Sequence, residues 1–261
     1  MGSRALRATL IAAVAAIALA IGALLIGGSE PAAKPKRPAR ILVFSKTAGF
    51  RHDSIPAGIA AIRRLGRAHG FSVTATEDAS AFRRKRLGRF DAVVFLNTTG
   101  DVLDPAQQAA FKSYIRHGGG FAGVHSATDT EYDWPFYARL VGVHFASHPA
   151  IQRATIKIVD RSHPSTRALP RRWTRTDEWY NFAADPRGGV HVLALLDEST
   201  YSGGTMGADH PIAWCHRVKG GRAWYTALGH TIDSYSEPLF REHLLGGILW
   251  AAGLARGDCR A

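Results

Sequence analysis

Gly118–Asp129 reads GGGFAGVHSATD, and the fold of the chain can be worked out from this stretch. Its glycines predict a turn, and Phe121–Val124 predicts a short buried strand directly after it. The strand stops at His125 and Ser126. In many α/β enzymes a tight strand-to-helix turn at this place presents the catalytic nucleophile. Here the presented side chain is an imidazole and not a cysteine. The turn therefore suggests nucleophilic catalysis, whereas the residue on it suggests a different chemistry.

The chain before this stretch alternates between apolar strands and amphipathic helices. Ile41–Phe44 and Ala92–Leu96 are continuous apolar runs, and Phe71–Thr76 alternates as a strand does. Ile55–His69 has the apolar spacing of a helix. Continuous apolar strands that alternate with helices predict an α/β fold, with a mainly parallel sheet and helices on both of its faces.

Two of the predicted helices carry recognisable start signals. Ser54 is a candidate N-cap for the first helix, with Pro56 in the first turn. Asp104, followed by Pro105 and by Gln107, predicts a capping box for a second helix, which Gly118 ends. These signals place each helix between two strands, as a parallel sheet requires.

The second half of the chain is less regular. Ile151–Val159 and Val190–Leu196 are predicted strands. Ile212–Val218 and Arg222–Leu228 flank a short glycine turn, which predicts a β-hairpin. Pro238–Leu254 has the apolar spacing of a helix and is predicted to close the domain.

The first 40 residues are predicted to lie outside this domain. Ala8–Ser29 is an uncharged apolar run, long enough to cross a hydrocarbon core of ~30 Å at ~1.5 Å per residue. We expect residues 1–29 to be an uncleaved transmembrane signal anchor or a cleaved signal peptide. Residues 30–40 are then a basic Pro/Ala linker, residues 41–254 one domain, and residues 255–261 a C-terminal tail.

The expected location follows from this leader, although the charges around it conflict. A short basic tail before an apolar run is the usual export signal. It predicts an extracytoplasmic domain, either secreted or held in the cell membrane by residues 8–29 as a single span. The linker carries four Lys and Arg residues, however, and positive charge of this kind tends to stay in the cytoplasm.

The net charge of +12 and the two cysteines limit the choice of partners. The excess arginines form runs without a nucleic-acid-binding motif, so we interpret them as a solvated basic face and do not expect a nucleic-acid partner. Cys215 and Cys259 do not have the spacing of a metal site. If the domain is exported, a disulfide between them that tethers the tail is one option.

Several polar side chains follow the predicted strands directly. His52, Asn97, His125 with Ser126, and His230 each stand after the end of a strand. Ligands of open α/β sheets bind outside the carboxyl ends of the strands, so we expect these groups to line one polar site. The alternative for each histidine is a structural role, in which the ring bonds to a loop.

An acidic pair lies within an aromatic segment further along the chain. Asp177 and Glu178 precede Trp179 and Tyr180, and burial against aromatic rings would raise the pKa of Glu178 and suit a general base. The alternative is a surface carboxylate paired with Arg175. Imidazoles and one carboxylate also make a common Zn²⁺ set, so His125, Glu178 and His230 are candidate ligands of a divalent metal.

The chain resembles the trehalose-utilisation, or ThuA-like, family from about Ile41 to Gly253. The residues that carry the resemblance are TAGFRHDSI (Thr47–Ile55), GGGFAGVHSATDT (Gly118–Thr130), HP with Gln152 (His148–Gln152), DEWYNF (Asp177–Phe182), DHPIAW (Asp209–Trp214) and GRAWYTALGHT (Gly221–Thr231). The family is similar in fold to class I glutamine amidotransferases, which implies a flavodoxin-like sheet. The family's recurrent polar residues match His52, His125, His148, Glu178, His210 and His230.

The resemblance implies a role in carbohydrate metabolism. Amidotransferase chemistry is not expected, because His125 replaces the cysteine of that superfamily's turn, and no nucleotide cofactor is expected. The main hypothesis is an enzyme of the lyase, isomerase or hydrolase class that acts on a glycoside or its 3-keto derivative by metal- or His/Glu-assisted proton transfer. The predicted catalytic residues are His125, Glu178 and His230, and the predicted substrate-binding residues are His52, Asn97, Ser126, Asp177 and Trp179.

Two other readings of the sequence stay open. The chain could be a non-catalytic carbohydrate-binding module at the cell surface, or a remnant of the fold without a ligand. A geometric observation separates them from the enzyme hypothesis, because a site requires that the histidines and Glu178 converge in one cleft.

Overall fold

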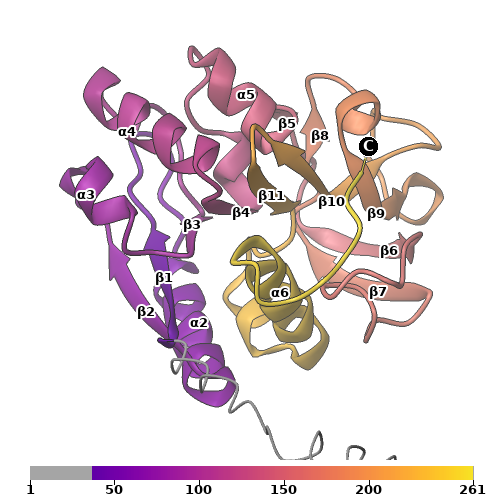
Figure 1. The fold of residues 1–261 in the computed structure, drawn as a ribbon. Helices are drawn as coiled ribbons and strands as arrows, with labels where there is room; N and C mark the ends of the chain where they lie inside the picture. The colour runs from indigo at the N-terminus through magenta and orange to yellow at the C-terminus, as the bar shows by residue number, and fades with distance from the viewer. Residues whose placement is uncertain (1–36, 261) are drawn as a thin grey trace, which may run out of the picture. The chain divides into compact units, whose positions relative to one another are not determined.

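The computed structural model describes residues 37–260, in which nine strands form one sheet (Figure 1). These strands are β1 (Ala39–Phe44), β2 (Phe71–Thr76), β3 (Ala92–Leu96), β4 (Gly120–Val124), β6 (Gln152–Ile158), β7 (Arg172–Asp177), β9 (His191–Asp197), β10 (Pro211–Val218) and β11 (Gly221–Thr226). Their order is β2-β1-β3-β4-β11-β10-β9-β6-β7. A separate antiparallel pair joins β5 (Phe145–Ser147) and β8 (Asn181–Phe182).

The sheet has a parallel half and an antiparallel half. The strands from β2 to β11 all pair in parallel, and their order is that of a flavodoxin-like sheet. The strands β10, β9, β6 and β7 extend it with antiparallel pairs. The predicted hairpin is therefore confirmed as β10–β11, and the antiparallel extension beyond it is larger than the sequence indicated.

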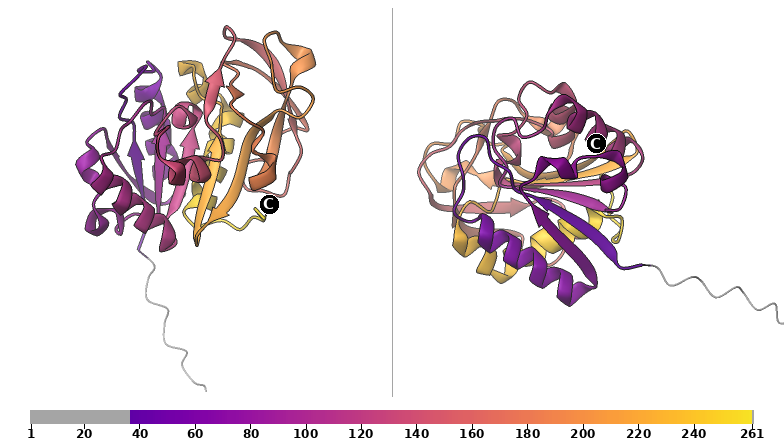
Figure 2. Two further views of the ribbon diagram at one scale, coloured as in Figure 1. Left: turned by 90° about the horizontal axis from the view of Figure 1, so that it is seen from above. Right: turned by 90° about the vertical axis from the view of Figure 1, so that its left-hand side faces the viewer.

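Helices cover both faces of the sheet, as predicted (Figure 2). The helices α2 (Ile55–His69) and α6 (Pro238–Ala251) lie on one face, and α3 (Arg84–Leu87), α4 (Pro105–Arg116) and α5 (Pro135–Val141) lie on the other. The described residues also contain five short 3₁₀ helices: Ala79–Ala81, His125–Thr128, Pro186–Gly189, Glu198–Thr200 and Ile232–Ser236.

The two predicted helix starts have different outcomes. The capping box of α4 is confirmed, because the Asp104 carboxylate accepts from the Gln107 backbone and the Gln107 side chain accepts from the Asp104 backbone. Ser54 stands at the N-cap position of α2, but its side chain makes no capping bond. Its hydroxyl accepts from the Asn97 amide at 3.0 Å instead, so the predicted N-cap position and first-turn proline are confirmed but the side chain does not cap the helix.

The C-terminal tail is bonded to the sheet. Cys215 of β10 and Cys259 form a disulfide, so that option is confirmed, and both residues are buried. The predicted linker is two residues too long, because β1 already begins at Ala39. The predicted membrane segment, residues 8–29, lies outside the described residues. Between residues 37 and 260, no helix is long and apolar enough to cross a membrane.

A buried histidine predicts how stability depends on pH. Burial lowers the pKa of His243 to about 4, although its Nδ1–H donates to the Ser165 carbonyl at 2.9 Å. In the unfolded chain the imidazole has a pKa of about 6.5, so below that pH the unfolded state binds more protons than the folded state. From pH 7 to pH 5 this residue should therefore lower the free energy of unfolding by about 2 kcal/mol.

The variant His243→Asn tests this expectation, because an amide can keep the bond to Ser165 and does not titrate. Urea unfolding of both proteins at pH 7 and pH 5 gives the measurement. We expect the variant to be less stable at pH 7 but to lose about 2 kcal/mol less on acidification. An equal loss in both proteins would show that His243 does not contribute.

Candidate active site

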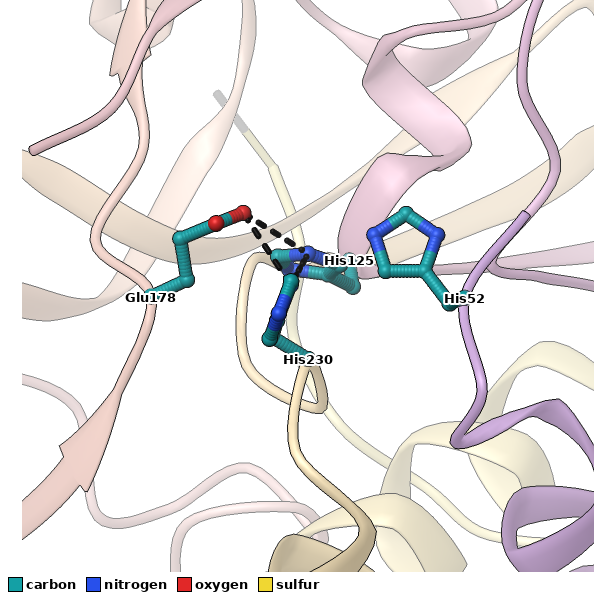
Figure 3. A group of neighbouring side chains, drawn as sticks. All are labelled: His52, His125, Glu178 and His230. Atoms are coloured by element: carbon teal, nitrogen blue, oxygen red, sulfur yellow. Dashed lines mark hydrogen bonds and ion pairs between the residues drawn. The ribbon is translucent and has the colours of Figure 1, made fainter. Parts of the chain in front are cut away.

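Three histidines and one glutamate meet at one point of the molecule (Figure 3). They are His52, His125, Glu178 and His230, and each offers one ligand atom within 4.8 Å of the others. His52, His125 and Glu178 are buried, and His230 is partly exposed. The convergence that a site requires is therefore present, and we call these four residues the His₃Glu cluster.

The parallel half of the sheet positions the three histidines. His52 lies in the loop after β1, His125 follows β4 directly, and His230 follows β11 after a short turn. These strands are parallel and close together in the sheet, so their carboxyl ends share one edge. His125 itself has a φ of +51°, the left-handed region that a non-glycine residue adopts at a cost of about 1–3 kcal/mol. Strain of this kind is typical of tight turns that present a functional side chain.

Hydrogen bonds fix the orientation of the His125 ring. Its Nδ1–H donates to the Ala227 carbonyl at 2.7 Å, so Nε2 carries the lone pair in the neutral ring. Nε2 lies 3.1 Å from His230 Nδ1 and 3.4 Å from Glu178 Oε2. An electron-rich nitrogen and a carboxylate oxygen thus face each other in a buried place, which favours a cation or a proton between them.

Glu178 reaches the cluster from the antiparallel half of the sheet. It follows the last residue of β7, Asp177, whose carboxylate accepts from the backbone N–H groups of Gly229 at 2.9 Å and His230 at 3.1 Å. Arg175 donates to the same carboxylate at 2.6 Å. These bonds hold the end of β7 against the turn after β11, so Glu178 and His230 are placed together.

The three imidazole rings surround a common point. The centroid of His52 is 4.9 Å from that of His125 and 5.0 Å from that of His230, and the His125–His230 separation is also 5.0 Å. Each pair of rings is close to perpendicular. His52 Nδ1 is buried and has no hydrogen-bond partner among the described residues. An unsatisfied buried nitrogen in such a place is a feature of a site that holds a ligand or an ion.

The groups of the cluster have shifted pKa values. Burial, with the neighbouring imidazoles, lowers the pKa of His52 to about 3, so this ring is neutral. Burial acts to raise the pKa of Glu178, but the adjacent imidazoles of His125 and His230 outweigh this effect and hold that pKa far below its usual range. The pKa of His230 is raised overall. Burial acts to lower it, but the bond to Glu178 and the nearby carboxylates outweigh burial. The general-base argument from a raised pKa of Glu178 is therefore wrong.

Three members of the His₃Glu cluster, His52, Glu178 and His230, line a cavity of about 400 Å³, whereas His125 is fully buried and does not line it. The other lining residues include Asp129, His148 and three aromatic side chains, Phe50, Phe145 and Tyr180. Phe50 is 65% exposed and stands at the rim. A polar cluster beside aromatic faces suits a sugar, because pyranose rings combine an apolar face with hydroxyl groups. A slightly larger cavity at the amino ends of the strands, beside Gly118, holds no comparable cluster within the described residues.

Four residues predicted to bind substrate do not line this cavity. Asn97, Ser126, Asp177 and Trp179 are each fully buried. Asn97 bonds to Ser54 and to the Gly229 carbonyl, and Trp179 donates to the Gln152 carbonyl. These predictions are corrected, because none of the four side chains lines the cavity. Asn97, Asp177 and Trp179 hold the loops around it, and Ser126 Oγ is buried without a hydrogen-bond partner among residues 37–260. The alternative for Glu178 is also wrong, since Arg175 pairs with Asp177 and Glu237.

Two polar residues of the cavity were missing from the predicted set of site residues. His148 Nδ1 lies 3.1 Å from the second carboxylate oxygen of Glu178, Oε1. Asp129 lies on the wall that follows the His125 turn. His148 stands in a His-Pro pair and Asp129 in the opening stretch, so both were visible as polar residues, but nothing local showed that they face one cavity.

The residues of the cluster fit a divalent metal ion. Imidazole nitrogens with one carboxylate form a common Zn²⁺ set that leaves a position for water or substrate. A histidine that binds a metal through one ring nitrogen usually donates the N–H of the other to a fixed acceptor. His125 does so, because its Nδ1–H donates to the Ala227 carbonyl and leaves Nε2 for an ion. Glu178 is in turn contacted by His148. The cluster can therefore hold a cation, or it can hold a proton shared between Glu178 and the imidazoles.

Comparison with known proteins identifies the family and similar folds. A family profile described as trehalose utilisation (ThuA) matches residues 40–251. A ThuA-like protein of Bacteroides uniformis is 23% identical, with a TM-score of 0.73 over 85% of this chain and 95% of that one. A ThuA-like protein of Parabacteroides merdae is 20% identical, with a TM-score of 0.70 over 85% and 92%.

A more distant likeness reaches part of a β-galactosidase from Rahnella sp. R3. It is 15% identical, with a TM-score of 0.54 over 84% of this chain and 32% of that one. Identities this low show a shared fold and carry no conclusion on activity. No curated protein matches the sequence.

Proposed function

Since this chain belongs to the trehalose-utilisation (ThuA) family, we propose that it is a carbohydrate-utilisation enzyme that acts on a keto derivative of a glycoside. One observation carries the proposal. Three imidazoles and a carboxylate converge, and three of these four groups, those of His52, Glu178 and His230, line a cavity that also has aromatic side chains in its wall. A divalent metal, held by His52, His125, Glu178 and His230, would supply the polarisation of a carbonyl or hydroxyl oxygen.

The substrate class follows from what such a site can do. A ketone makes the hydrogen on the neighbouring carbon acidic, so polarisation of the carbonyl oxygen favours proton removal from that carbon. In a 3-keto-glycoside the neighbouring carbon, C2, lies between the ketone and the anomeric carbon. Removal of its proton permits either isomerisation of the ketone or elimination of the glycosidic oxygen. The cavity of about 400 Å³ lies within the usual range for small-molecule sites, roughly 300–1,000 Å³.

The protein's own residues orient the substrate. Phe50 is exposed and offers an apolar surface on which a pyranose ring can stack, and Phe145 and Tyr180 add apolar side chains to the cavity wall. His148 is exposed and bonds to Glu178 through Nδ1, so its other ring nitrogen can also donate to a sugar hydroxyl at the rim.

Metal analysis followed by substrate conversion tests this function. We expect the purified protein to hold about one divalent ion per chain, and to convert a 3-keto-disaccharide such as 3-keto-trehalose into products seen by NMR. Chelation should remove the ion and the activity together, and added Zn²⁺ or Mn²⁺ should restore both.

The outcome that contradicts the proposal is also specific. Saturable binding of a saccharide without any product and without a metal requirement would favour a carbohydrate-binding module. If conversion survives complete removal of the metal, the proposed enzymatic activity stands and the proposed metal requirement is rejected. Proton transfer by the imidazoles and Glu178 would then remain as the explanation.

A further inference from the structure

We propose that Asp129 is the residue that takes the proton from the carbon beside the ketone and returns it to the leaving oxygen. The inference rests on the proposed function and adds a catalytic residue to it. Three observations support it: the carboxylate oxygens of Glu178 are already engaged, Asp129 faces the same cavity, and one of its oxygens is free to react.

Both oxygens of Glu178 are held by imidazoles. Oε2 lies 3.1 Å from His230 Nδ1 and 3.4 Å from His125 Nε2, and Oε1 lies 3.1 Å from His148 Nδ1. A carboxylate in this position can ligate an ion or orient the rings. It has little freedom to approach a C–H bond of a substrate, so a proton acceptor must stand elsewhere on the wall.

Asp129 has the geometry of that acceptor. It lines the cavity with His52, Glu178 and His230, and it is neither fully buried nor fully exposed. Tyr132 donates its hydroxyl to Oδ1 at 2.7 Å. Among residues 37–260 nothing donates to Oδ2, which leaves this oxygen available. One side of the carboxylate is thus oriented and the other is able to react.

The backbone around Asp129 is rigidly held. Its N–H donates to the Ser126 carbonyl at 2.8 Å, and its carbonyl accepts from the Gly100 N–H at 2.8 Å. The residue stands directly after the 3₁₀ turn that His125 begins, so one short segment carries a member of the cluster and Asp129. A general base needs this kind of fixed placement beside the reacting atom.

The electrostatic surroundings agree with a proton-transfer role. Burial raises the pKa of Asp129 above its usual range, although the Tyr132 hydroxyl and the imidazoles of His125 and His144 act to lower it. A carboxyl group with a raised pKa holds and releases a proton closer to neutral pH, which improves it as a general base and acid.

The step can be written with every atom accounted for. Asp129 takes the C2 proton of the 3-keto-glycoside, and the C–H electron pair forms a C2–C3 double bond as the carbonyl becomes an enolate. The enolate then re-forms the ketone and a C1–C2 double bond, and the C1–O bond breaks. Asp129 returns the proton to the departing oxygen, so the products are an unsaturated keto-sugar and an alcohol or free sugar.

The test is hydrogen exchange, which does not require the leaving group to depart. Methyl 3-keto-glucoside is incubated in D₂O with the metal-loaded protein, and deuterium at C2 and released methanol are followed by NMR. In Asp129→Asn we expect both signals to fall at least a hundredfold, because general acid–base catalysis contributes typically 10²–10⁴-fold. Metal content and the Kd for the keto-sugar should stay within about threefold of the original protein.

Matched variants keep the result interpretable. Asp133→Asn changes an exposed carboxylate of the same loop that does not line the cavity, and should leave exchange unchanged. Asp129→Glu keeps the acid and should recover part of the exchange, which a merely structural role would not require. If the original protein exchanges the C2 hydrogen for deuterium and Asp129→Asn does so equally fast, Asp129 is not the base and the proposed function stands. If the original protein neither exchanges nor converts the keto-sugar, the proposed function fails and the role of Asp129 with it.

Discussion

Replacing His125 with alanine is expected to lower kcat/KM for a 3-keto-glycoside at least a thousandfold, while the fold stays intact. The His125 ring is the centre of the His₃Glu cluster, with contacts to both His230 and Glu178. The proposed metal would supply several kcal/mol of charge stabilisation in the transition state. Each 1.36 kcal/mol is a factor of ten in rate, so losing about 4 kcal/mol gives the thousandfold effect. The metal content of the variant should fall in parallel.

Two further variants separate chemistry from backbone strain. His125→Asn also removes the imidazole, but asparagine tolerates the left-handed φ of this position, so it should be at least as stable as the alanine variant and equally inactive. His117→Ala removes an exposed imidazole at the end of α4 and should keep full activity. Turnover retained in His125→Asn, with the protein still folded, would reject the role of this residue.

The parallel half of the fold could be predicted because its signals are local. The strands β1, β3 and β4 are short continuous apolar runs, and α4 has a capping box that the structure confirms. Once parallel strands are recognised, their carboxyl ends must share an edge. That rule alone brought His52, His125 and His230 to one place. The prediction depended on periodicity and topology and needed no side-chain geometry.

One strand of the antiparallel half, β7, was not predicted, because most of its buried positions are charged. In β7 the buried face consists of Trp173, Arg175 and Asp177, alternating with exposed threonines and Arg172. Two of the three buried side chains are charged, so the strand has no hydrophobic alternation to recognise. Their burial depends on partners far away in the sequence, including Gly229 and Glu237.

The same long-range contacts explain the errors in the predicted site. Asp177 and Glu178 are neighbours in sequence, and both were assigned to the site. Successive residues of an extended segment point in opposite directions, so only one of them can face the cavity. The structure turns Glu178 toward the cavity and Asp177 toward the backbone of Gly229 and His230. Which of the two faces the cavity depends on tertiary packing, which the sequence pattern does not contain.

Replacing Asp177 with asparagine is expected to lower the free energy of unfolding by about 3–5 kcal/mol, the usual cost of breaking a buried ion pair from one side. The Asp177 carboxylate is fully buried and accepts from Arg175, from Gly229 N–H and from His230 N–H. An amide keeps one acceptor oxygen and sets its NH₂ against donors that point at the other. The Arg175 charge then loses one of its two carboxylate partners, since only Glu237 remains.

A second pair of the same chemistry provides the control for this prediction. Asp209 pairs with Arg187, and both side chains are about half exposed, so Asp209→Asn should cost less than about 1 kcal/mol. Urea unfolding of the two variants at pH 7 gives the comparison, and equal small losses would contradict a supporting role for Asp177.

Asp177→Asn should also bind the proposed divalent ion more weakly, even where it is fully folded. The reason is that Asp177 holds the backbone of His230, so a ligand of the cluster loses its placement although no ligand has been removed.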